Sequence, residues 1–190
     1  MTLPRKHPAA PLKVSSCTKA TCEMWRFQFD PSGYAYVSLD AGTGVFSITS
    51  DWGNWAYIWN PGSVGGDHDV KKFIGCRTNT DYLAKKLTQG QCTEEFDADA
   101  TKAAWKKYIE EEADDVGQKQ QMLDLLADCD WSTDSVDLFI DHMDIYLWEF
   151  LGELDDMLEM RPSYTYLALR DLLLPVIQAQ FKEEIGYKEV

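Results

Sequence analysis

The chain has 190 residues and a formal net charge of −14, and residues 91–190 carry 25 acidic against 8 basic side chains. Such a one-sided field repels nucleic acid and acidic membranes and attracts basic protein surfaces. The aromatic content of 13% argues against a disordered acidic chain, and no apolar run approaches the roughly 18 residues of a membrane-spanning helix.

Residues 1–16 contain three prolines and three Lys or Arg side chains but lack the apolar stretch of a signal peptide. We predict a flexible tail at 1–16 and one domain over 17–190. The five cysteines are an odd number without zinc-type spacing, so we expect free thiols in a reducing cytoplasm.

Four runs with a two-residue period follow between residues 23 and 60. Their alternating apolar residues are Trp25, Phe27 and Phe29; Ala35, Val37 and Leu39; Phe46 and Ile48; and Trp55, Tyr57 and Trp59. Short turns rich in Gly, Asp and Ser separate the runs. This pattern predicts an antiparallel meander of four strands, one face of which must be covered by other elements.

Patterns with a helical period fill the remainder of the chain. We predict helices over 70–76, from Asn79 or Thr80 to near Gly90, from Asp97 or Asp99 towards Gly117, and over 118–128. The longest helix is expected over 133–160, because apolar residues recur there at steps of three and four. A final helix over 163–185 should be kinked or split by Pro175.

Strands therefore precede helices, which is the pattern of the α+β class. We predict a single domain in which an N-terminal antiparallel meander, within a sheet-rich part at 17–90, is covered by a strongly acidic helical part at 91–190. Two subdomains that meet near residue 91 are the alternative.

The acidic helices are the main candidate for a functional surface. Residues 108–159 carry 17 acidic residues and one base, Lys119. Like charges at three- and four-residue steps destabilise a helix, so their retention favours a function over a merely solubilising, solvated face. Carboxylates four residues apart on a helix are about 6 Å apart, and two such helices roughly match a phosphate ladder. The predicted partner-binding residues are Glu110, Glu111, Asp114, Asp115, Asp137, Asp141, Asp144, Asp155 and Asp156.

Two other segments support alternative functions. Asp67, His68 and Asp69 follow two glycines and would be the ligands of a metal-dependent hydrolase, although no second cluster has matching spacing and a surface turn explains them as well. The other alternative is an interaction module that works through an exposed, Trp-rich sheet face with Trp52, Trp55 and Tyr57. No P-loop, dinucleotide fingerprint or paired nucleophile and base is present, so we predict no enzyme activity, cofactor or metal.

Residues 43–59 read TGVFSITSDWGNWAYIW and are followed by Phe73-Ile74 and by DYLAKKL at 81–87. This set, about a quarter of the chain, resembles a segment of small phage and prophage proteins. The resemblance implies a phage origin, and small acidic phage proteins resemble, as a class, inhibitors of host defence such as anti-CRISPR proteins of type I complexes.

From the charge and this resemblance together, we expect a non-enzymatic inhibitor in the cytoplasm of the bacterial host. Its acidic, DNA-mimicking helical surface would block the basic nucleic-acid-binding surface of a host complex, with a CRISPR effector favoured. We expect no direct contact with nucleic acid or membrane, and the oligomeric state is left open.

Overall fold

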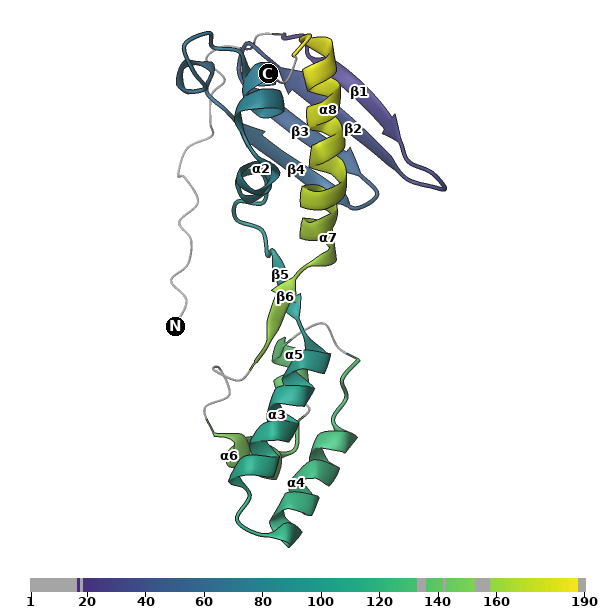
Figure 1. Cartoon of the computed structure of the whole chain (residues 1–190), viewed down its shortest axis with the longest axis vertical. Helices are drawn as coiled ribbons and strands as arrows, with labels where there is room; N and C mark the ends of the chain where they lie inside the picture. The colour runs from purple at the N-terminus through teal and green to yellow at the C-terminus, as the bar shows by residue number, and fades with distance from the viewer. Residues whose placement is uncertain (1–16, 18, 133–135, 142, 153–157, 188–190) are drawn as a thin grey trace.

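The computed structural model describes residues 17, 19–132, 136–141, 143–152 and 158–187, so the predicted tail at 1–16 lies outside the described residues. The described chain forms two bodies joined by a narrow two-stranded ribbon (Figure 1). We call residues 23–91 together with 163–187 the sheet body, and residues 97–159 the helical lobe. In the described residues no helix is long and apolar enough to cross a membrane.

The sheet body is built on the four-stranded antiparallel meander that the two-residue period predicts. Its strands β1 (Glu23–Gln28), β2 (Tyr34–Asp40), β3 (Val45–Ser50) and β4 (Gly53–Ile58) lie in the order β1-β2-β3-β4. Val37, Ile48 and Trp55 are paired across β2, β3 and β4 and are all buried. The alternation is confirmed because one face of the sheet is packed and the other is exposed.

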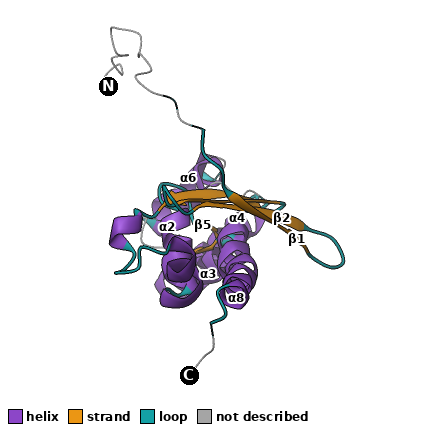
Figure 2. Ribbon diagram, turned by 90° about the horizontal axis from the view of Figure 1, so that it is seen from above, coloured by secondary structure: helices purple, strands orange, loops and turns teal. Residues whose placement is uncertain are grey.

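Helices from two distant parts of the chain cover this face (Figure 2). The first part is a 3₁₀ turn, η1 (Pro61–Ser63), α1 (Val70–Lys72) with its π-helical turn η2 (Phe73–Arg77), and α2 (Thr80–Leu87). The second is α7 (Tyr164–Leu167), the π-helical turn η4 (Ala168–Leu173) and α8 (Leu174–Glu184). Phe181 of α8 is fully buried and stacks on Trp25 and Phe46 of the sheet.

Pro175 neither stops nor splits the last helix. It occupies the first turn of α8, directly after the wider turn η4. Proline removes one backbone donor and crowds the carbonyl four residues earlier, and a π-helical turn relieves that crowding because its hydrogen bonds span five residues. The helical segments η4 and α8 therefore continue one another across the proline.

The helical lobe has a hydrophobic core of its own. Its helices are α3 (Ala98–Glu112), α4 (Val116–Asp128), α5 (Val136–Asp141) and α6 (Ile145–Leu151). Trp105 is fully buried at the centre, and Phe139 and Trp131 pack against it with ring centroids 5.6 and 5.7 Å away. The core residues of the lobe are distinct from those of the sheet body.

The prediction that the acidic helical part as a whole covers the sheet is therefore wrong, although the α+β class is confirmed. Among the described residues after position 91, only the segment from α7 to α8 returns to the sheet, and the described part of 97–159 packs on itself. The ribbon of β5 (Glu94–Phe96) and β6 (Met160–Pro162) separates the two cores. The apolar residues of each body pack within that body. The lobe therefore does not need to pack on the sheet, and it projects away from it (Figure 1).

The long helix predicted over 133–160 is also wrong. Helix α5 ends at Asp141, and Asp144 begins a new helix by accepting a hydrogen bond from the backbone N–H of Tyr146 at 2.8 Å. Gly152 then ends α6 with φ +73°. A capping side chain competes with helix continuation, and the break lets Phe139 and Leu147 both reach the same core.

All five cysteines are free thiols, as expected. Burial raises the pKa of the thiols of Cys76 and Cys129 above the usual value, which makes both weaker nucleophiles at neutral pH.

Candidate interaction surfaces

The charge of the protein is separated between its two bodies. The helical lobe, residues 97–159, contains 19 acidic and 4 basic residues, whereas the remainder of the chain contains 13 acidic and 14 basic ones. The lobe thus carries a net −15 and the rest a net +1, so the field of the protein originates almost entirely in the lobe.

The densest group of acids lies at the connection between α3 and α4, which Figure 1 shows at the end of the molecule farthest from the sheet. We call this group the acidic tip, and all of its side chains are exposed. It consists of Glu110, Glu111, Glu112, Asp114 and Asp115. Four of these five were predicted as binding residues; Glu112 was missed, although its place next to Glu111 in the sequence was a sufficient signal.

The acidic tip is only weakly neutralised by the protein itself. Lys107 and Glu111 form an exposed ion pair at 3.8 Å, which contributes little in water. The ammonium group of Lys119 donates to the backbone carbonyl of Glu110 at 2.6 Å. The last turn of α3 contains no basic residue, so its carboxylates lie at the negative end of the helix dipole, where they are disfavoured.

Asp115 has a structural reason to be acidic. Its carboxylate accepts a hydrogen bond from the backbone N–H of Gln118 at 2.8 Å and caps the start of α4. The side chains of Glu110, Glu112 and Asp114 make no hydrogen bond or ion pair with another described residue. Their charge is therefore available to a partner.

The structure does not bring all the predicted residues together. Asp144 and Asp128 line one small pocket of about 260 Å³, and Asp128 lies at the opposite end of α4 from the tip, about 18 Å along the helix axis. Asp141, on α5, is exposed. Asp137 lies on α5, and Asp155 and Asp156 lie outside the described residues.

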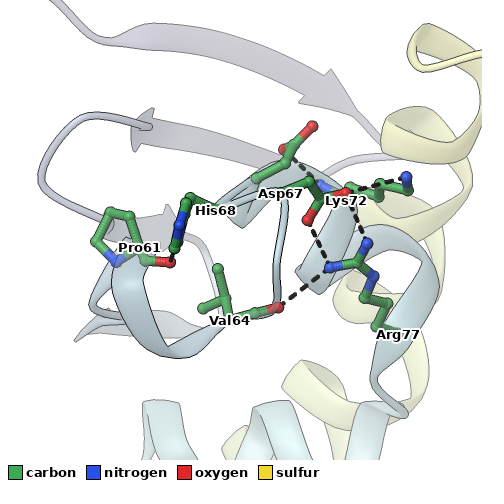
Figure 3. A network of polar contacts seen from close by, with 7 residues as sticks. Pro61, Val64, Asp67, His68, Lys72 and Arg77 are labelled. Atoms are coloured by element: carbon green, nitrogen blue, oxygen red, sulfur yellow. Dashed lines mark hydrogen bonds and ion pairs between the residues drawn. The ribbon is translucent and has the colours of Figure 1, made fainter.

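Figure 3 shows that Asp67 and His68 have separate contacts rather than one common centre. Arg77 donates to both oxygens of Asp67 at 2.7 and 2.6 Å, and Lys72 donates to one of them at 3.1 Å. These cations hold the pKa of Asp67 well below its usual range. Asp69 caps α1, with its carboxylate 2.9 Å from the backbone nitrogen of Lys72.

His68 makes a further contact that holds the loop between η1 and α1. Its Nδ1 lies 3.0 Å from the carbonyl oxygen of Pro61, which can only accept a hydrogen bond. Among the described residues, no group of three or more His, Cys, Asp or Glu side chains is placed to hold a metal ion. These contacts explain the Asp-His-Asp sequence as a fixed surface turn, and they lend no support to the hydrolase alternative.

The Trp-rich face is not the exposed face of the sheet. Trp55 is 4% exposed and belongs to the core, so the expectation that it is free to bind is wrong. Trp52 is half-buried and donates through Nε1 to the hydroxyl of Tyr164 at 3.2 Å. Tyr57 is half-buried against Trp59. The exposed large residues of the open face are Met24, Tyr34, Tyr36, Val45 and Ile58.

Four basic residues of the sheet body, Lys71, Lys72, Arg77 and Arg170, are paired with acids of the same body. The ammonium group of Lys71 lies 2.6 Å from Glu23 and 2.8 Å from Glu184, and it sits 4.8 Å above the ring of Trp25. The hydrogen bond from Lys71 is the main reason that the pKa of Glu184 falls to about 2. This pairing disfavours a nucleic-acid surface here, because the cations are already engaged.

A family model described as a phage family matches residues 14–183. No curated protein and no solved structure matches the chain.

Proposed function

The chain belongs to this phage protein family, and we propose that it is a non-enzymatic inhibitor of a host defence complex. In this anti-CRISPR-like role, the acidic surface of the helical lobe mimics DNA and occupies the Lys and Arg side chains with which the host complex grips nucleic acid. A type I CRISPR effector is the favoured partner, and the site of action is the cytoplasm of the bacterial host.

The observation that carries this proposal is the separation of charge between the two bodies. A net −15 in the lobe, against +1 elsewhere, is more than solubility requires of a small domain. The acidic tip keeps Glu110, Glu112 and Asp114 without internal partners. The helix pair already orders the backbone that carries these carboxylates, so no segment has to fold on binding, which favours association with a preformed basic surface.

The arrangement of the lobe supports the same proposal. Helices α3 and α4 lie side by side (Figure 1), and their connection places the acidic tip at the far end of the molecule. A projecting, acidic pair of helices can enter a groove that admits a duplex, because the ribbon holds the bulkier sheet body away from it. The partner's cations would then meet carboxylates in place of phosphates.

The test compares two triple variants of the full chain. The tip variant Glu110→Gln, Glu111→Gln, Asp114→Asn removes three charges but keeps the cap Asp115. The control variant Asp81→Asn, Glu94→Gln, Glu183→Gln removes three exposed charges from outside the lobe. Each is used as bait in host lysate with identification by mass spectrometry, and then in a DNA-binding assay with the purified type I effector.

We expect the tip variant to lose about ten-fold or more of its inhibition and the control variant to retain it. Inhibition by the unmodified protein should weaken steeply between 50 and 500 mM salt, because exposed charge pairs are screened. Equal activity of both variants, or an affinity that is independent of salt, would refute an electrostatic inhibitor and leave solubility as the role of the acids.

A further inference from the structure

An open groove of about 510 Å³ lies in the sheet body between the β1–β2 turn and the helix formed by η4 and α8. Its apolar wall consists of Phe29, Pro31, Trp52, Leu172, Pro175 and Val176. Leu172 is 48% exposed and Val176 is 40% exposed, although both point from a helix whose other side is in the core. Concave apolar sites of this size are typical of binding pockets, and the fold does not need these two side chains to be apolar.

The walls of the groove are held by contacts within the protein. The indole of Trp52 donates a hydrogen bond to the hydroxyl of Tyr164, and the backbone N–H of Trp52 donates one to the hydroxyl of Ser50, each at 3.2 Å. Its ring meets Phe29 edge to face at 5.3 Å. Gly33, with φ +142°, lets the hairpin backbone pack against the indole, since a Cβ there would lie 2.9 Å from the ring. A preformed site avoids the ordering cost that weakens binding.

The polar groups of the groove select a cation. Asp30 is exposed, and its carboxylate makes no hydrogen bond or ion pair with another described residue. Asp171 is acidic as well, but Arg170 already donates to both of its oxygens at 2.7 and 2.8 Å. None of the residues that line the groove is basic. A phosphate group is therefore repelled, whereas a Lys or Arg side chain finds an unpaired carboxylate.

We propose that this groove binds a peptide segment of a protein partner in which an apolar side chain is flanked by Lys or Arg. The apolar side chain packs on Trp52, Leu172 and Val176, and the cation pairs with Asp30. The groove is open and its helix wall is well exposed, which suits a side chain presented by a protein rather than an enclosed small molecule. This second interaction surface goes beyond the proposed function and does not depend on the acidic tip.

The experiment titrates the ¹⁵N-labelled full chain with three eight-residue peptides, whose central residues are Leu-Arg-Lys, Leu-Glu-Glu and Gly-Arg-Lys. A salt concentration of 300 mM screens the general attraction of basic peptides to the helical lobe. The resonances of the Trp52 indole N–H and the Leu172 amide report on the groove. The Leu-Arg-Lys peptide should shift both and bind about ten-fold more tightly than either of the others, since only it supplies both contacts.

Two single variants locate the site. Leu172→Gln should weaken binding of the Leu-Arg-Lys peptide about five-fold or more, and Asp30→Asn about two-fold or more, because an exposed ion pair contributes less than a buried apolar contact at this salt concentration. The matched control is Ile145→Gln, which removes a 64% exposed apolar side chain from the lobe and should leave binding unchanged. All three variants should remain folded, because the substituted side chains are exposed.

Three results would overturn the proposal. They are equal binding of the three peptides, shifts confined to the acidic tip, and equal affinities of the Leu172→Gln and Ile145→Gln variants. None of them bears on the inhibition assay, so failure of this inference is distinguishable from failure of the proposed function.

Discussion

Replacing Trp105 by alanine should unfold the helical lobe and leave the sheet body intact. Trp105 is fully buried and stacks on Trp131 and Phe139, and truncating a core Trp or Phe to Ala costs about 3–5 kcal/mol. At about 0.05–0.15 kcal/mol per residue, a lobe the size of residues 97–159 has a total stability of roughly 3–9 kcal/mol. The loss is thus comparable to the whole stability of the lobe.

Amide hydrogen exchange read by mass spectrometry measures the unfolding of each body, because it follows peptides from the two bodies separately. In the Trp105→Ala protein, α3 and α4 should lose most of their protection, whereas β2 and β3 should keep theirs. The matched variant Phe181→Ala truncates a fully buried ring of the other core and should produce the opposite pattern.

The two cores have no residue in common, so each body should unfold separately. If either variant deprotected both bodies to the same extent, the molecule would be one cooperative unit and the ribbon would transmit folding between them. The acidic lobe and the neutral sheet body would then differ in charge but would not be independently stable units.

Two further predictions concern local interactions. Asp144→Ala removes the cap of α6 and should lower the free energy of unfolding of the lobe by about 1 kcal/mol. Urea denaturation measures this change. If the free energy of unfolding is unchanged within error, the break after α5 does not depend on this side chain. The pKa of Glu184 is about 2 in the folded protein against 4.5 as a free side chain, so its contribution to stability is present above about pH 4.5 and is lost as the pH falls towards 2. The Glu184→Gln protein should therefore show a shallower loss of stability in that window, and an unchanged pH profile would contradict the role of the Lys71 pair.

Sequence patterns alone anticipated part of the candidate surfaces. The concentration of acids in 108–159 is visible in the sequence, and Glu110 to Asp115 are neighbours in the chain, so their grouping needs no tertiary information. By contrast, Asp144 and Asp128 line the same pocket only because α6 packs against α4. The groove escaped prediction because its walls, Phe29, Trp52 and Leu172, come from three separated segments.

The local features of the fold follow directly from the sequence. The two-residue alternation of residues such as Val37 and Ile48 sets which side chains share a face, and Asn79 and Asp97 cap the helices that they precede. These properties depend on period and on hydrogen bonds between near neighbours, so they are determined within a few residues.

Tertiary structure decided which apolar stripe packs on which. Periodicity indicates which face of an element is buried but not which other element covers it. The sequence therefore left open that Phe181, which follows the lobe in the chain, packs against Trp25, which precedes it. It also left open that Trp55 faces the core while Tyr36 faces outwards, because both lie on alternating strands. That choice depends on how distant surfaces fit together, and here it places the net negative charge on a lobe that stands clear of the sheet.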